Sequence, residues 1–113
     1  MLQPANLRFL STAADHVIAQ GEYYLSHHGA GLEARWFTAI NRTTDQILLL
    51  PESRPTEMED DLPPDLRHAI VLGFRDFLLF YRYLPEADVV IVVAVLRGNM
   101  NLHDALQYLP MDE

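Results

Sequence analysis

Apolar residues recur at steps of three and four along the first half of the chain, the spacing of a helix with one buried face. We expect a helix to begin near Ser11 and Thr12, which are good N-cap residues, with Asp15 close to its positive end. Glycine tolerates the backbone conformation that ends helices, so a turn is predicted at residues 29–31. The stripe on this first helix comprises Ala14, Val17, Ile18, Gly21, Tyr24, Leu25 and His28.

A second apolar stripe of the same period follows the turn directly. We expect this second helix to stop at Pro51, because proline cannot continue a helix. Two helices joined by so short a turn pack antiparallel, so a helical hairpin is predicted, preceded by a short strand at residues 6–9. The stripe on the second helix comprises Leu32, Trp36, Ala39, Ile40, Thr43, Ile47 and Leu50.

The second half of the chain has the composition of strands. Residues 66–71 form one candidate strand, and residues 76–84 form another that is rich in aromatic side chains. Residues 85–88 read as a hairpin turn. Residues 89–96 are apolar on both faces, which predicts a central strand buried from both sides. Asn101 caps a short helical turn at residues 102–106.

The element order predicts an α+β fold. An antiparallel helical hairpin at the N-terminus packs on a small antiparallel sheet, in the order βααβββ with a short C-terminal helical turn. A chain of 113 residues has the length of one domain, so residues 1–113 are expected to form a single unit.

An acidic connector links the two halves. Residues 51–65 contain four prolines and six acidic residues against one Arg54, a local charge of −5. This composition predicts a solvated segment. The whole chain carries a formal charge of −8, and all of its basic residues except histidine are arginines. Strong direct binding to nucleic acid is therefore not expected, because neutralising phosphates requires a cationic surface.

Several classes of protein lack support in the sequence. Residues 1–6 do not resemble a signal peptide, the longest apolar run has eight residues, and cysteine is absent. We therefore expect a cytoplasmic protein that does not bind membranes. No nucleotide-binding or hydrolase motif is present, so no cofactor is expected. The five histidines lack metal-ligand spacing and are expected to be structural or solvated, and the acids of the connector to be solvated as well.

Arginines accompany the strands in two places. The aromatic run at residues 74–83 is interleaved with Arg75 and Arg82, which suggests either a base-stacking platform or, as the favoured interpretation, strand core. Arg97 leaves the central strand beside Gly98, at a strand end where sites are commonly built. A functional role for Arg97 and a structural ion pair with Asp76 or Asp104 remain equally open.

Four short segments, in this order and spacing, resemble the RelE/ParE superfamily of bacterial toxins from type II toxin–antitoxin modules. The resemblance extends from about Asn6 to Leu106. The segments are Ala13-Ala14-Asp15, Leu48-Leu49-Leu50-Pro51, Phe77-Leu78-Leu79-Phe80-Tyr81-Arg82 and Val95-Leu96-Arg97-Gly98-Asn99.

The resemblance implies one of two mechanisms. RelE-like members are ribosome-dependent mRNA endonucleases that use Arg, Lys and Tyr side chains, whereas ParE-like members lack that set and inhibit DNA gyrase. Leu78 stands where the RelE-type arginine of the middle strand is expected, Met100 replaces a second cation, and the chain has no lysine. The sequence therefore resembles the ParE branch more closely.

Three hypotheses follow from this resemblance. The first is a ParE-like, non-enzymatic gyrase inhibitor neutralised by a cognate antitoxin that folds over the hairpin and sheet, with Trp36 and Tyr81 facing the antitoxin. The second is a ribonuclease using Arg97 with Tyr81 or His103 as acid and base. The third is an inactive toxin fold that only binds antitoxin. For the first, the residues expected to contact the target are Arg75, Arg82, Arg97, Gly98 and Asn99.

Overall fold

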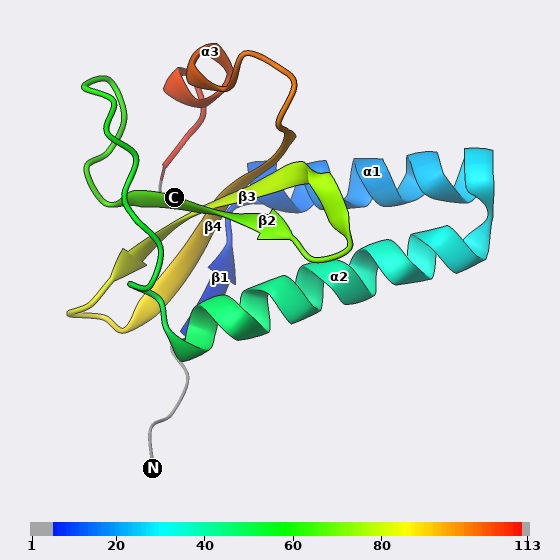
Figure 1. Ribbon diagram of the computed structural model, residues 1–113, viewed down its shortest axis with the longest axis horizontal. Coiled ribbons are helices and arrows are strands. Elements are labelled where there is room, and N and C mark those ends of the chain that lie inside the picture. Colours follow the sequence, from blue (N-terminus) through cyan, green and yellow to red (C-terminus); the bar gives the residue numbers. More distant parts are fainter. Residues whose placement is uncertain (1–5, 112–113) are drawn as a thin grey trace.

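Two long helices and a four-stranded sheet make up most of the chain (Figure 1). The computed structural model describes residues 6–111. Residues 1–5, most of the segment that does not resemble a signal peptide, lie outside this range, as do the acidic residues 112 and 113. The predicted α+β order βααβββ, with a short C-terminal helix, is confirmed. The elements are β1 (Asn6–Phe9), α1 (Ser11–His28), α2 (Ala30–Leu49), β2 (Leu66–Val71), β3 (Phe74–Leu84), β4 (Val89–Arg97) and α3 (Leu102–Gln107).

The strands lie in the order β1-β4-β3-β2. Strands β2, β3 and β4 form the predicted antiparallel meander, with Gly73 at positive φ in the first turn and Asp88 at positive φ in the second. Strand β1 adds a parallel pairing, in which Asn6 lies opposite Val89. The sequence did not predict this pairing, because the two strands are far apart along the chain. Strand β4 is central, as its apolar faces predicted.

The helical hairpin covers one face of the sheet. Gly29 joins the two helices at φ +92°, which confirms a turn at this position. The turn is shorter than the predicted residues 29–31, because Ala30 and Gly31 already belong to α2. The indole N–H of Trp36 donates to the carbonyl of Val17 at 2.9 Å and so links α2 to α1 inside the core. The buried residues on this face include Ala13, Val17, Tyr24, Trp36, Ala39, Ile40, Ile47, Val71, Phe77, Leu79, Tyr81, Val90, Val92 and Val95.

The connector and α3 cover the other face. Leu62 of the connector and Leu106 of α3 are buried there with strand residues that alternate with those of the hairpin face. Asn101 caps α3 as predicted, since its Oδ1 accepts from the amide of Asp104 at 3.3 Å. None of the helices within residues 6–111 is long and apolar enough to cross a membrane.

Three local expectations need correction. Leu10 occupies the N-cap of α1, so neither Ser11 nor Thr12 does. The buried stripe of α1 runs through Ala13, whereas Ile18 and Leu25 are 50% and 47% exposed, because α1 turns a slightly different face toward α2 and β4. The connector is not simply solvated. Its Thr56 pairs with Arg67, and the amide of Glu57 donates to the carbonyl of Leu66 at 2.7 Å, so this segment extends the edge of the sheet.

Candidate functional site

Four of the five predicted target-binding residues meet at one end of the sheet. Arg75, Arg97, Gly98 and Asn99, together with Asp76, line a hollow of about 360 Å³ where β3 begins and β4 ends. The amide of Gly98 donates to the carbonyl of Asp76 at 2.7 Å, which ties the loop after β4 to β3. A Cβ at Gly98 would lie 3.6 Å from that oxygen, an ordinary contact, so the geometry does not demand glycine there.

The guanidinium of Arg97 lies over an aromatic ring. Its central carbon is 5.1 Å from the ring centroid of Phe77, a cation–π arrangement that places the charge above the end of the sheet. Within residues 6–111, Arg97 forms no ion pair with Asp76, Asp104 or any other carboxylate. The structural ion pair that the sequence left open is therefore not formed in this part of the chain, and the positive charge faces solvent.

A second hollow, of about 410 Å³, adjoins the first and shares Arg97 and Asn99 with it. Its other wall is α1, which contributes His16 and Gln20. Nδ1 of His16 accepts from the amide of Val95 at 3.2 Å. Burial lowers the pKa of His16 below its ordinary value, and the nearby charge of Asp15 offsets only part of this effect. His16 is therefore a neutral acceptor near neutral pH.

Sequence reasoning missed His16 and Gln20 as part of this region. The Nε2 of Gln20 is buried and has no hydrogen-bond partner among residues 6–111. His16 follows the buried Ala13 by three positions, and Gln20 follows the buried Val17 by three positions, so both lie beside the buried stripe of α1. Polar residues beside a buried stripe are the signal in the sequence that could have identified them.

Arg82 lies elsewhere. Its guanidinium forms two bonds with the carboxylate of Asp65, at 2.8 Å and 3.1 Å, and donates to the carbonyl of Met111 at 3.2 Å. It follows Phe77 by five positions on β3, roughly 16 Å along the strand. The structure therefore does not bring Arg82 together with Arg97, and it uses this side chain to hold the connector and the C-terminal segment on the sheet.

Trp36 and Tyr81 are both completely buried. The hydroxyl of Tyr81 donates to the carbonyl of Pro51 at 3.4 Å. Burial raises the pKa of the Tyr81 phenol, and the charges of Arg54 and Arg67 oppose that shift. Neither side chain reaches the surface, so an antitoxin-facing groove would be formed by other residues.

The three groups proposed for a ribonuclease do not converge. Tyr81 belongs to the cluster under the hairpin, whereas His103 lies on the opposite face, where its Nε2 is 3.1 Å from a carboxylate oxygen of Asp61. His103 lines a small hollow of about 210 Å³ together with His68, which is bonded to the carboxylate of Glu57. Within residues 6–111, no three histidine or acidic side chains are placed to hold a metal ion.

Comparison with protein families decides what kind of protein this geometry belongs to. Residues 7–102 match the family model described as ParE toxin of type II toxin-antitoxin system, parDE. The chain belongs to the ParE toxin family. The match spans β1 through the start of α3 and therefore includes the hollow at Arg97. A comparison with curated proteins found no significant match.

Solved structures share the fold of this ParE-family chain at low sequence identity. A chain of the chromosomal ParDE TA system from P. aeruginosa has a TM-score of 0.67 and 13% identity, over 82% of this chain and 95% of that chain. A mutant of the E. coli toxin RelE in the free state has a TM-score of 0.62 and 15% identity, over 93% of this chain and 95% of that chain. The isolated E. coli RelE toxin has a TM-score of 0.55 and 15% identity, over 89% and 93%. These similarities support the RelE/ParE fold and carry no information about the target.

Proposed function

We propose that this ParE-family toxin inhibits DNA gyrase without catalysis, and that a cognate antitoxin neutralises it in the cytoplasm. One observation carries the proposal: Arg75 and Arg97 converge at the end of the sheet beside Gly98 and Asn99. Neither arginine forms an ion pair within residues 6–111. Exposed guanidinium groups of this kind pair well with carboxylates on a protein surface.

A protein target fits the charge of the chain better than a nucleic acid does. The net charge of −8 repels a phosphate backbone as a whole, whereas a local pair of arginines can still engage an acidic protein surface. Leu78 supplies no cation on the middle strand, and the candidate catalytic groups Arg97, Tyr81 and His103 lie apart. These features favour inhibition by binding over cleavage of RNA.

The test is a supercoiling assay with purified gyrase. We expect the wild-type chain to inhibit supercoiling and the Arg75→Ala/Arg97→Ala variant to need at least about tenfold more protein for the same inhibition, since hot-spot arginines commonly contribute this much. Arg8→Ala is the matched control, because Arg8 is an exposed arginine of β1 that pairs with Ile91, away from Arg97. Its inhibition should equal that of the wild type.

Two results of the supercoiling assay would overturn the proposed target or its site. A wild-type chain that leaves supercoiling unchanged excludes gyrase as the target. A double variant that inhibits as well as the wild type removes the arginines from the site. Mapping mRNA ends after induced expression tests the ribonuclease alternative, because codon-phased cleavage with normal supercoiling would replace the present proposal. Toxicity that a co-expressed antitoxin fails to suppress would contradict the second half of it.

A further inference from the structure

The hollow at the end of the sheet and the hollow beside α1 are two halves of one site, because Arg97 and Asn99 line both. The half at the end of the sheet is cationic. Arg75 and Arg97 are exposed there and form no ion pair within residues 6–111. Asp76 is the one acidic residue that lines this half in the described part of the chain. The cationic half can therefore accept a carboxylate from a partner.

The half beside α1 is mainly apolar, and two of its large side chains are open to solvent. Tyr23 of α1 is 45% exposed, and Met100 of the loop after β4 is 44% exposed. Phe77 and Leu96 are buried beneath them. No acidic residue among residues 6–111 lines this half. An apolar side chain placed between Tyr23 and Met100 would be removed from water directly beside Arg97.

Contacts within the chain hold this apolar half in place. The ring of Tyr23 stacks on His27 with the two centroids 4.3 Å apart, and Nδ1 of His27 donates to the carbonyl of Tyr23 at 3.0 Å. The amide of Met100 donates to the carbonyl of Arg97 at 3.4 Å, which closes the turn after β4. A preorganised site loses less conformational entropy on binding, which strengthens binding for the same contacts.

The aromatic rings at this site leave little surface for stacking a nucleic-acid base. One face of the Tyr23 ring is stacked on His27, and the guanidinium of Arg97 covers the ring of Phe77. A base needs a free aromatic face, and its phosphate would be repelled by the net charge of −8. The apolar half therefore fits an aliphatic or aromatic side chain of a protein better than a base.

Gln20 provides a separate observation. It lines the apolar half, and its Nε2 is buried without a hydrogen-bond partner among residues 6–111. A buried donor without an acceptor is unfavourable. A protein segment carries a backbone carbonyl at every residue, so a segment bound in the hollow would supply an acceptor once the amide of Gln20 turns toward it.

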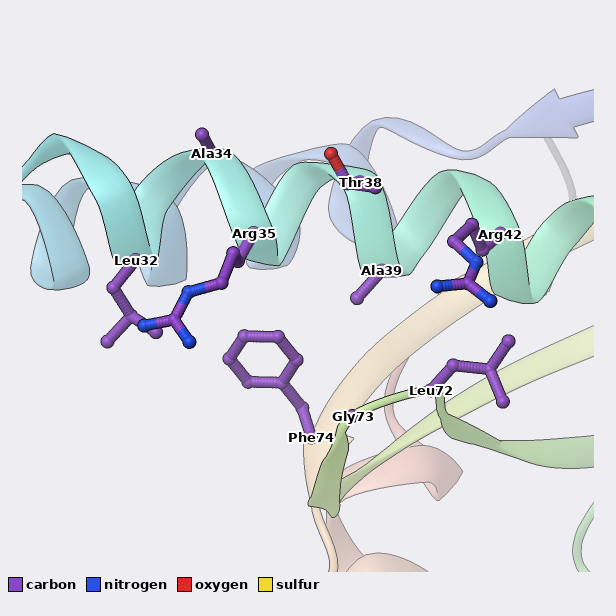
Figure 2. Close-up of a pocket in the computed structure, with 9 residues that line it drawn as sticks. All are labelled: Leu32, Ala34, Arg35, Thr38, Ala39, Arg42, Leu72, Gly73 and Phe74. Carbon is purple, nitrogen blue, oxygen red and sulfur yellow. The ribbon is translucent and has the colours of Figure 1, made fainter.

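A second pair of arginines offers an internal comparison. Arg35 and Arg42 line a groove of about 420 Å³ between α2 and the turn that joins β2 to β3, and Figure 2 shows the ring of Phe74 between the two guanidinium groups. They are seven positions apart on α2, about 10 Å along its axis, so they present their charges to separate groups. This groove shares no lining residue with either half of the site.

We propose that the two halves together bind a protein segment in which a large apolar side chain stands next to a carboxylate. The carboxylate lies on Arg75 and Arg97, and the apolar side chain lies between Tyr23 and Met100. The arginines thus select the charge, while Tyr23 and Met100 select the apolar neighbour. That the segment belongs to gyrase rests on the proposed function, whereas its chemistry rests on the site.

The first experiment titrates short capped peptides into the purified full-length chain at low salt and follows its amide resonances by NMR. One peptide has a phenylalanine next to a glutamate, a second has alanine in place of the phenylalanine, and a third has glutamine in place of the glutamate. The first should bind at least about fivefold more tightly than either of the others. Its binding should shift the resonances of Tyr23, Arg97 and Met100.

Two double variants separate the halves of the site. Tyr23→Ala/Met100→Ala should lose the preference for phenylalanine over alanine and keep the preference for glutamate over glutamine. Arg75→Ala/Arg97→Ala should do the opposite. Thermal unfolding of each variant confirms that it is folded.

Two further double variants are matched controls. Tyr108→Ala/Met58→Ala removes the same two residue types from exposed positions that line neither half. Arg35→Ala/Arg42→Ala removes the other pair of arginines. Both should retain the two preferences within about twofold, because substitutions away from a site change it little.

Three results of the titration would overturn the proposal. The three peptides could bind equally well, or their shifts could map to Arg35 and Arg42. A thymidine dinucleotide could bind more tightly than the first peptide at the same resonances, which would identify a nucleic-acid base as the occupant.

The supercoiling assay distinguishes this proposal from the proposed function. Where the wild type inhibits gyrase, Tyr23→Ala/Met100→Ala should need at least about fivefold more protein for the same inhibition, and equal inhibition would refute the role of the apolar half. A wild type that leaves supercoiling unchanged refutes only gyrase as the target, because the peptide titration contains no gyrase and decides the chemistry of the site by itself.

Discussion

The imidazole of His16 contacts β4 just beyond the point where the pairing of β1 with β4 ends. The last pair between those strands is Phe9 with Val92, so the amide of Val95 has no strand partner on that side. His16 supplies the missing acceptor through Nδ1, at 3.2 Å. Only a neutral imidazole can do this, because protonated Nδ1 would present an N–H to another N–H. The contact between α1 and the sheet therefore depends on the protonation of one residue.

This dependence predicts a loss of stability in acid. Because the pKa of His16 is lowered from 6.5 in the folded chain, its stabilising contribution is complete above about that pH and is lost as the pH falls through the folded-state pKa. We expect the free energy of unfolding to fall between pH 7.5 and pH 5, and to fall less in His16→Asn, whose amide oxygen accepts without titrating. Urea denaturation at both pH values measures this. Identical pH dependence in the two proteins would assign the effect to other groups.

Substituting alanine for glycine is expected to have opposite effects on stability at two positions of the hairpin. A Cβ at Gly21 would lie 2.5 Å from Cζ of Phe37, whereas a Cβ at Gly31 would meet nothing within 4 Å. Gly31→Ala should raise the free energy of unfolding by about 0.5–1 kcal/mol through helix propensity. Gly21→Ala should lower it by about 1–2 kcal/mol, because the clash exceeds that gain.

Thermal or urea unfolding of both glycine variants provides the measurement. Combining Gly21→Ala with Phe37→Ala removes the ring, so the added methyl group should cost less in that background than in the wild type. If Gly21→Ala stabilised the chain as much as Gly31→Ala, the two helices would not be in close contact at this position.

At the scale of elements, hydrogen bonds and an ion pair hold the connector against the sheet. Arg67 donates to the backbone carbonyls of Glu52 and Arg54, and the Arg82–Asp65 pair fixes the end of the connector just before β2. A segment rich in proline and acid has the composition of a solvated loop, and only its partners on β2 and β3 reveal the packing. Its buried apolar anchor is Leu62.

Asp65→Asn should release this connector. The substitution removes the negative charge of Asp65 from the partly buried guanidinium of Arg82, so we expect the free energy of unfolding to fall by about 1 kcal/mol. Hydrogen exchange should also accelerate at the amide of Glu57, which bonds to Leu66. Arg97→Ala is the control, since its exposed side chain should change stability by no more than about 0.5 kcal/mol. A connector anchored by other contacts would leave both quantities unchanged in Asp65→Asn.

Local patterns predicted the elements better than their assembly. The two helices, the turn at Gly29 and the apolar strand β4 follow from patterns of neighbouring residues, and these predicted elements are confirmed, although the buried face of α1 differs from the predicted stripe. The parallel pairing of β1 with β4 depends on how the intervening helices and strands pack, which no local window contains. The burial of Trp36 against Val17 likewise requires both helices in place.

At the scale of the whole molecule, the net charge does not indicate where the arginines gather on the surface. The sequence placed Arg75 and Arg97 near the ends of adjacent strands, and the structure brings them to one hollow. It could not show that Arg82 is paired with Asp65, or that Arg35 and Arg42 face the turn between β2 and β3. A net charge of −8 thus coexists with two separate clusters of arginines that have no ion-pair partner within residues 6–111.

The topology predicts a gradient of stability centred on β4. Residues Val89 to Val92 have strands on both sides and lie between two apolar clusters, whereas β1 is a short edge strand and α3 has only six residues. Amides in doubly paired strands open only with global unfolding, so native-state hydrogen exchange should be slowest for β4 and its partner β3. Exchange should be faster in β1 and fastest in α3. Protection in α3 equal to that in β4 would mean that the C-terminal face unfolds only together with the central sheet.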